Sequence, residues 1–250
     1  MRRRERGIAF LCCVSDEAKL HRLRASIDAL LVPPDVEVDV LVERNVASLP
    51  AAYNRLLRAA GDRRYKAYVH QDVVVLNRNL VSDVLRLFEM RTIGLIGVAG
   101  CRYLPDSCVW WDGSGVFGHV LELHEEGPRP LEFEPVTGDY ERVEAVDGLC
   151  LITQYDVSWD ENVAPFHFYD VAQATRFVLA GYDVVVPRQT EPWLAHDATL
   201  LDERARREFF AARDAFRARY ALRRERFARG RLRRRGRRLA TKVRTRIGPR

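Results

Sequence analysis

The sequence predicts an α/β fold in which a mostly parallel sheet is flanked by helices. Continuous apolar runs alternate with segments whose apolar residues recur every three or four positions, and these are the signatures of buried strands and amphipathic helices. Over the first 72 residues the order is strand, helix, strand, helix, strand. Strands that follow one another in this way are parallel and are joined by right-handed crossovers.

The N-terminal elements can be assigned in order. We expect strands over 8–14, 36–42 and 65–69, and helices from 16 to about 31 and over 49–60. Pro33 and Pro34 end the first helix, because proline cannot continue it. The strands lead into Ser15-Asp16-Glu17, Glu43-Arg44-Asn45 and His70-Gln71-Asp72. Ligands bind at the carboxyl ends of strands in such sheets, so these polar segments are the first place to look for a site.

The C-terminal half is more irregular. We expect strands over 93–99, 116–123, 142–153 and 182–186, a helix over 170–180, and a proline-containing loop over 125–139. From Leu201 onward apolar residues recur every three or four positions up to Tyr220. This spacing predicts a terminal amphipathic helix that docks through one face.

Charge divides the chain into unlike parts. The whole chain carries +6, but residues 1–6 carry +3 and residues 221–250 carry +13, so the remainder carries −10. We therefore expect a basic N-terminal arm (1–6), one main domain (7–198), an amphipathic helix packed on it (199–222) and a flexible Arg-rich tail (223–250). Such a tail can bind any polyanion, including phosphate backbones and anionic lipid headgroups.

Several classes of protein are disfavoured by simple features. A transmembrane helix needs an apolar run of about eighteen residues, and the sequence contains none. The apolar stretch 8–14 is too short for a signal peptide and runs into a charged segment. The five cysteines are odd in number and lack paired metal-ligand spacing. Buried free thiols in the reducing cytoplasm are therefore expected.

Residues with chemical potential lie at strand and helix ends. His70 and Asp72 are two positions apart at a strand tip, so both can face one metal ion or phosphate group. The alternative is that His70 caps the strand and Asp72 caps a turn, and an isolated pair favours this structural role. Asp170 opens a helix, where a capping role is also open.

The order of these features resembles the nucleotide-sugar-dependent glycosyltransferases of the Rossmann-like GT-A fold. The closest likeness is to family 2 of inverting enzymes, in its bacterial "glycosyltransferase-like" branch, and it runs from about Ile8 to Asp197. It is carried by six segments: Ala51–Ala60 with Asn54, Val69–Val75, Val146-Asp147-Gly148, Ser158–Glu161, Phe168-Tyr169-Asp170 with Arg176 and Gly181-Tyr182, and His196.

The resemblance implies an inverting transfer of a sugar from a nucleoside diphosphate sugar to a hydroxyl group. The acceptor would be a saccharide, a lipid-linked saccharide or a cell-envelope glycan. Asp170 would be the general base, and Asp72 with His196 and His70 would hold Mn²⁺ or Mg²⁺, the imidazoles suiting Mn²⁺ better. Two departures stand out, since His70 replaces the first Asp of the Asp-x-Asp motif and Tyr169 replaces a Glu.

The remaining candidate residues fall into two groups. For nucleotide contact the resemblance indicates Ser15, Asp16, Glu17, Glu43, Asn54, His70 and Gln71. For the acceptor or the donor sugar it indicates Trp110, Trp111, Asp147, Gly148, His167 and Tyr169. Helix capping and solvated charge are the alternatives for the acidic residues, and core packing is the alternative for the tryptophans.

Rival functions remain open to different degrees. A nicotinamide-dependent enzyme would need a glycine-rich first turn, and Cys13–Glu17 contains no glycine. A serine hydrolase would need a Gly-x-Ser-x-Gly elbow, which Gly113-Ser114-Gly115 does not provide. The His at position 70 keeps open a non-catalytic protein that binds a sugar or nucleotide. For the tail we expect peripheral attachment to the inner face of the membrane rather than nucleic-acid binding.

Overall fold

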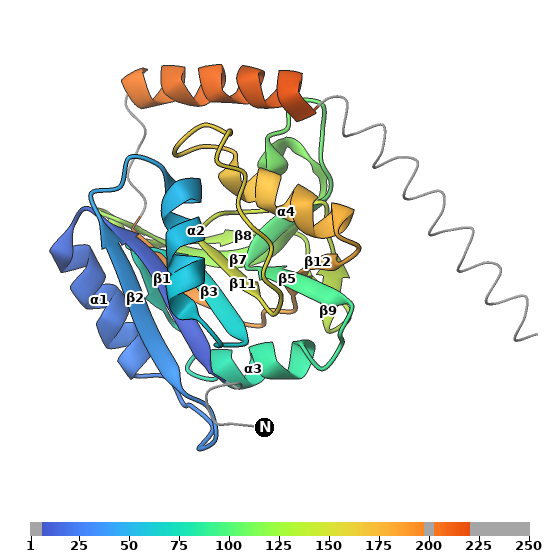
Figure 1. Cartoon of the computed structure of the whole chain (residues 1–250). Coiled ribbons are helices and arrows are strands. Elements are labelled where there is room, and N and C mark those ends of the chain that lie inside the picture. The colour runs from blue at the N-terminus through green and yellow to red at the C-terminus, as the bar shows by residue number, and fades with distance from the viewer. Residues whose placement is uncertain (1–6, 198–202, 221–250) are drawn as a thin grey trace, which may run out of the picture.

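The computed structural model describes residues 7–197 and 203–220, and these form a central sheet with helices on both faces (Figure 1). In spatial order the central sheet contains β2 (Val38–Arg44), β1 (Ile8–Val14), β3 (Tyr65–His70), β11 (Cys150–Thr153), β5 (Ile93–Gly97), β12 (Asp183–Pro187) and β9 (Tyr140–Arg142). The predicted α/β class is confirmed. The predicted N-terminal strands and helices lie within one or two residues of their expected starts.

The central sheet is mixed rather than mostly parallel. The strands β2, β1 and β3 are parallel, as predicted, and β5 and β12 are parallel as well. Strand β11 runs antiparallel to both β3 and β5, and β9 runs antiparallel to β12. A strand that is not preceded by a helical crossover can run in either direction. The alternation of strands and helices in the sequence therefore does not predict the directions of β11 and β9.

Alternate residues of the strands point to opposite faces of the sheet and pack into two separate hydrophobic cores. Helices α1 (Glu17–Asp28) and α3 (Leu80–Leu87) share one core with Phe10 and Cys12 of β1. Helix α2 (Leu49–Ala60) and the later part of α4 (Tyr169–Leu179) share the other core with Ala9 and Leu11. The apolar run of β1 is continuous because both faces of the strand are covered.

A second sheet lies beside the carboxyl edge of the first. Its strands are, in order, β10 (Ala145–Val146), β6 (Ala99–Tyr103), β7 (Ser114–His124), β13 (Leu194–His196) and β4 (Val73–Val75), with β8 (Gly127–Glu132) paired to β7. The predicted loop over 125–139 is therefore wrong in part. Strand β8 accommodates Pro128 and Pro130 because it is an exposed edge strand, where a missing N–H breaks no ladder on the solvent side.

The single strand predicted over 142–153 is also wrong. The segment contributes to β9, β10 and β11, and these belong to two different sheets. The break between β10 and β11 includes Asp147 and Gly148, and Asp147 Oδ1 accepts a hydrogen bond there from the backbone N–H of Leu149 at 2.8 Å. This local hydrogen bond closes a turn. The continuous apolar pattern of the segment gives no sign of that turn, so it predicted one strand.

Residues 203–220 form a helix that lies across the top of the domain in Figure 1. Its buried residues are Ala212, Phe216 and Tyr220. Phe216 stacks on Phe168 with ring centroids 5.4 Å apart, and the Tyr220 hydroxyl donates to Asp160 at 2.8 Å. The arm over 1–6, the tail over 223–250 and residues 198–202 and 221–222 lie outside the described residues, so their predicted roles stay predictions.

Two further predictions can be compared with the structure. All five cysteines are free thiols, and four of them are buried. No helix within residues 7–197 and 203–220 is long and apolar enough to cross a membrane.

Candidate active site

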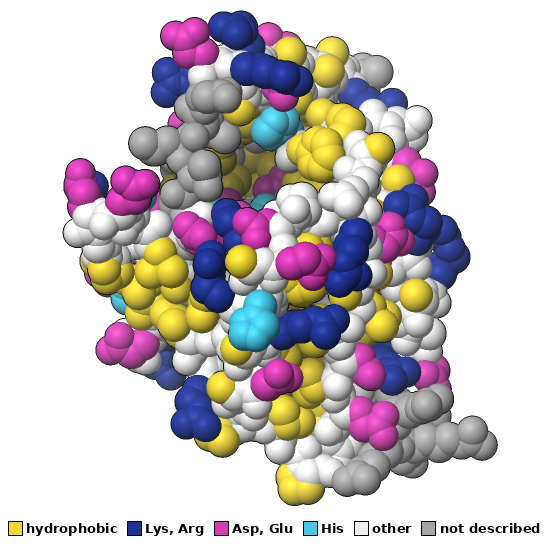
Figure 2. Space-filling view, turned by 90° about the vertical axis from the view of Figure 1, so that its left-hand side faces the viewer, with side chains coloured by type: hydrophobic (Ala, Val, Ile, Leu, Met, Phe, Trp, Pro, Cys, Tyr) yellow, Lys and Arg dark blue, Asp and Glu magenta, His cyan; other side chains and the backbone are white. Residues whose placement is uncertain are grey.

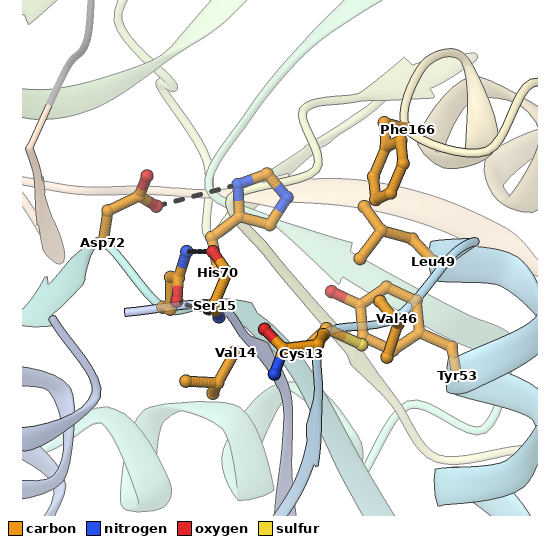
Figure 3. Close-up of a pocket in the computed structure, with 11 residues that line it drawn as sticks. Cys13, Val14, Ser15, Val46, Leu49, Tyr53, His70, Asp72 and Phe166 are labelled. Atoms are coloured by element: carbon orange, nitrogen blue, oxygen red, sulfur yellow. Dashed lines mark hydrogen bonds and ion pairs between the residues drawn. The ribbon is translucent and has the colours of Figure 1, made fainter. Parts of the chain in front are cut away.

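A cavity of ≈ 300 Å³ lies at the carboxyl ends of β1, β2 and β3, beside the start of α2 (Figure 3). Its lining is formed by Cys13, Val14, Ser15, Asn45, Val46, Leu49, Tyr53, His70, Gln71, Asp72 and Phe166. Of the expected nucleotide contacts, only Ser15, His70 and Gln71 line it. The cavity lies at the edge of the sheet where the sequence predicted a site, but its apolar and aromatic lining of Tyr53, Leu49 and Phe166 was not among the predicted residues.

Gln71 ties the ends of β1 and β3 together. Its Oε1 accepts hydrogen bonds from the backbone N–H groups of Ser15 and Asp16 at 2.8 and 2.9 Å, and its Nε2 donates to Ser15 Oγ at 2.9 Å. Asp16 caps α1, since its Oδ1 accepts from the N–H groups of Ala18 and Lys19. Gln71 lines the cavity, whereas the Asp16 side chain is used in capping and does not.

The other acidic candidates are held in ion pairs on the rim. Glu17 pairs with Arg44 and Glu43 pairs with Arg55, each at 2.6 Å. Hydrogen bonding to Arg44 lowers the pKa of Glu17. Neither glutamate lines the cavity, so contact with a bound nucleotide would require these pairs to open or the ligand to extend over them.

Asn54 is buried, does not line the cavity and makes hydrogen bonds to a loop. Its amide donates to the carbonyl oxygen of Trp159 at 3.1 Å and to Glu161 at 2.7 Å, and its oxygen accepts from the N–H of Trp159 at 2.8 Å. The motif residues Asn54 and 158–161, which are separated by about a hundred positions, therefore meet. Their meeting supports the loop that leads into α4.

The three expected metal ligands converge on one carboxylate oxygen. Asp72 Oδ1 lies 4.0 Å from His70 Nδ1 and 3.9 Å from His196 Nε2. It is buried and accepts no hydrogen bond from the described residues. Strands β13 and β4 pair directly, which brings His196 beside Val73 and so next to Asp72.

A metal ion would satisfy this orphaned oxygen, and the donor set fits a transition ion. Two imidazoles and one carboxylate are softer ligands than the oxygen set that Mg²⁺ prefers. Burial lowers the pKa of His70, so its ring is neutral at pH 7 and can ligate. As they stand, however, no three His, Cys, Asp or Glu side chains of the described residues are close enough to complete a metal site. The ligands would have to move together.

Tyr169 and His70, the two departures from the family pattern, contact each other. His70 Nε2 is hydrogen-bonded to the hydroxyl of Tyr169, a buried residue at the start of α4. A Cβ at position 148 would collide with this hydroxyl, so the glycine at that position is required for the contact. Tyr169 therefore orients the His70 ring and contacts neither the cavity nor solvent to any extent.

Asp170 lies one residue further along α4, beside Asp147 and Gly148. Burial, and then the negative charge of Asp147, raise the pKa of Asp170 to about 7, against the opposing effect of backbone N–H groups. Asp147 itself accepts from Trp110 Nε1 at 3.1 Å and from the N–H of Leu149. A half-buried carboxylate with a pKa near neutrality suits a general base.

The two tryptophans expected to contact the acceptor or the donor sugar have different environments. Trp110 is buried and donates its indole N–H to Asp147, which agrees with the core-packing alternative. Trp111 is 50% exposed and stacks on Phe209 of the C-terminal helix. His167 contacts the same Phe209 ring. Figure 2 shows a hollow beneath this helix, with hydrophobic and histidine side chains on its rim and acidic side chains deeper inside.

Comparison with protein families gives one match. The profile of a family described as "Glycosyltransferase like family" matches residues 9–219, which is most of the chain. No curated protein matches the chain significantly.

Solved structures share the fold at low sequence identity. A mannosyltransferase from Pyrobaculum calidifontis in complex with GDP-Man and Mn²⁺ is 12% identical, with a TM-score of 0.50 over 79% of this chain. GalNAc-T7 with UDP, GalNAc and Mn²⁺ is 11% identical, with a TM-score of 0.54 over 78% of this chain. TarS 1–349 from S. aureus in complex with UDP-GlcNAc is 9% identical, with a TM-score of 0.51 over 78%.

These comparisons concern only part of each solved chain. The present chain spans 58%, 43% and 60% of the three, respectively. At such identities the likeness shows a GT-A fold and carries no information on the sugar or the acceptor.

Proposed function

This chain belongs to the glycosyltransferase-like family, and on that premise we propose that it transfers a sugar from a nucleoside diphosphate sugar to a hydroxyl group of a glycan or lipid-linked acceptor. The donor nucleotide would occupy the cavity at the carboxyl ends of β1 and β3. Its base would pack against Phe166, which is 49% exposed, and Leu49, the apolar residues of the lining that Figure 3 shows on the α2 side. The diphosphate would point toward Asp72.

The observation that carries this proposal is the environment of Asp170. With a pKa of about 7, its carboxylate is ionised in a large fraction of molecules at neutral pH and still basic enough to accept a proton. An acceptor hydroxyl hydrogen-bonded to it would lose its proton to Oδ as its oxygen attacks the anomeric carbon. The glycosidic bond to the diphosphate breaks in the same step. One such displacement inverts the anomeric configuration.

The leaving group is strongly anionic and needs positive charge beside it. A Mn²⁺ ion held by Asp72, His70 and His196 would stabilise the charge that develops on the diphosphate. The chain's own contribution is to turn both imidazoles toward Asp72 Oδ1 and, through burial, to keep the His70 ring neutral. Tyr169 orients the His70 ring through the hydrogen bond to Nε2.

The direct test is a thermal-shift screen of nucleoside diphosphates with and without Mn²⁺. We expect at least one nucleoside diphosphate to raise the melting temperature, because a ligand that binds only the folded state stabilises it. Asp72→Asn should abolish the part of the shift that depends on Mn²⁺. The matched control is Asp106→Asn, a carboxylate far along the chain that lines no part of the cavity.

Two outcomes would contradict the proposal at different levels. If no nucleoside diphosphate shifts the melting temperature, the transferase function fails. If nucleotides bind but no sugar is transferred to any hydroxyl acceptor, the chain is a non-catalytic nucleotide-binding member of the family, as the histidine at position 70 first suggested.

A further inference from the structure

Lys19 lies between two carboxylates, Asp72, which lines the cavity, and Asp197, which follows His196. Its Nζ is 3.7 Å from Asp72 Oδ2 and 3.8 Å from Asp197 Oδ2, and its side chain is 20% exposed. Both distances exceed that of a hydrogen bond, so the ammonium group is loosely held. By contrast, Arg22, one turn further along α1, grips Asp197 at 2.6 Å.

The position of Lys19 in its helix is electrostatically unfavourable. It lies in the first turn of α1, where the helix dipole presents partial positive charge and acidic residues are preferred. Asp16 and Glu17 follow that preference, whereas Lys19 opposes it. The two nearby carboxylates offset this cost. Lys19 therefore puts a positive charge at the edge of the sheet, although a positive charge in the first turn destabilises helix α1.

The two sides of the Asp72 carboxylate face different partners. Oδ1 faces the imidazoles of His70 and His196, and Oδ2 faces Lys19. The backbone also links these groups, because the N–H of Asp197 donates to the carbonyl oxygen of Asp72 at 2.9 Å. Arg22, Asp197, Lys19 and Asp72 thus form a row of alternating charges that ends at the cavity.

We propose that Lys19 is a tethered cation of the diphosphate subsite, which exchanges its loose contacts with Asp72 and Asp197 for the phosphate oxygens of the donor. The proposal rests on the function proposed above and goes beyond it. Because Arg22 already neutralises Asp197, Lys19 can move toward the phosphates without leaving that carboxylate unpaired. The diphosphate can then bind without a divalent ion, and the ion strengthens this binding instead of being required for it.

The same position has a second consequence. An ammonium group within 4 Å of Asp72 repels a divalent ion that approaches the same carboxylate. Lys19 should therefore weaken the binding of the metal alone. Removing its charge should act in opposite directions on the two ligands, and a merely structural role for Lys19 would not do this.

The test measures two affinities in the wild-type chain and in Lys19→Met. Binding of UDP and GDP is followed by calorimetry in EDTA and in Mn²⁺, and binding of Mn²⁺ alone is followed by the electron paramagnetic resonance of the free ion. In EDTA we expect Lys19→Met to weaken nucleotide binding by about tenfold or more, the scale of a close charge pair. In the absence of nucleotide we expect the variant to bind Mn²⁺ several-fold more tightly. Lys19→Arg should resemble the wild type in both measurements.

Arg24→Met is the matched control, because Arg24 is an exposed cation of the same helix and lines no part of the cavity. It should change neither affinity by more than about twofold. If the wild type binds a nucleoside diphosphate only with Mn²⁺, or if Lys19→Met binds Mn²⁺ no more tightly, the role of Lys19 is overturned while the proposed function stands. If the wild type binds no nucleoside diphosphate in either condition, both fail.

Discussion

Two neighbouring carboxylates, Asp147 and Asp170, differ in what surrounds them. Asp147 receives hydrogen bonds from Trp110 and from the backbone of Leu149, so its oxygens are satisfied. Asp170 is half-buried beside that charge, and its pKa is raised to about 7. Pairs of carboxylates in unlike surroundings are a common way to obtain one permanent charge and one proton acceptor at neutral pH.

This division makes a prediction about pH. Transfer should increase as pH rises through about 7, because Asp170 must lose its proton before it can accept one from the acceptor. Asp147→Asn removes the negative charge that helps to raise the pKa of Asp170, so the rising limb of the kcat/KM profile should move to lower pH. Asp147→Glu keeps the charge and is the control. An identical midpoint in Asp147→Asn and the wild type would contradict the electrostatic role of Asp147.

At the scale of secondary-structure elements, the C-terminal helix is anchored to the loop that leads into α4. Asp160 is buried, which raises its pKa, but hydrogen bonds from Asn162 and Tyr220 and the charge of Arg219 prevail and lower the pKa to about 2. The folded pKa lies below the unfolded value. The stability that the ionised Asp160 carboxylate contributes to the fold is therefore present above about pH 4 and is lost as pH falls toward 2.

Tyr220→Phe tests this anchor. Loss of one buried hydrogen bond to a charged group should lower the free energy of unfolding by about 1–3 kcal/mol at pH 7, measured by urea denaturation. The difference from the wild type should shrink as pH falls, because Asp160 then becomes protonated in both. Tyr103→Phe removes a hydroxyl from a tyrosine that is 53% exposed and should change little. An effect of Tyr220→Phe that is equal at pH 7 and at pH 2 would argue against the anchor.

Elements with strong local signals were predictable from the sequence, and others were not. Helix α2 has its predicted bounds because its apolar face and Pro50 mark it clearly. Helix α3 was missed because its eight residues are too short for a periodic signal. Strand β8 was missed because its prolines normally indicate a loop.

The site was predictable only in part for a related reason. Its strand ends could be located, since parallel strands bring their carboxyl ends to one edge. The contacts between side chains could not, because they join distant segments: His70 meets Tyr169 across 99 positions, and Arg22 meets Asp197 across 175. Burial, which sets the pKa of Asp170, also depends on packing that no local pattern contains.

At the scale of the whole molecule, charge is distributed unevenly between the domain and its tail. The tail over 223–250 carries the basic excess, and peripheral attachment to an anionic membrane remains a proposal that rests on composition alone. Removing residues 223–250 should abolish co-sedimentation with anionic vesicles at physiological salt. The melting temperature should stay within about 2 °C, because the deleted segment lies beyond the helix of residues 203–220. Equal pelleting of both forms would exclude this role, and neutral vesicles are the control.

The central claim is that Asp170 accepts the proton in a single displacement on a nucleoside diphosphate sugar. The measurement that tests it most directly is release of nucleoside diphosphate from donor sugar in the presence of a hydroxyl acceptor, followed for the wild type and for Asp170→Asn, with the anomeric configuration of the product read by NMR. We predict an inverted product and a rate that is lower by about 10²-fold or more in the variant, with nucleotide affinity unchanged. A variant that transfers sugar as fast as the wild type, or a product with retained configuration, would contradict the account.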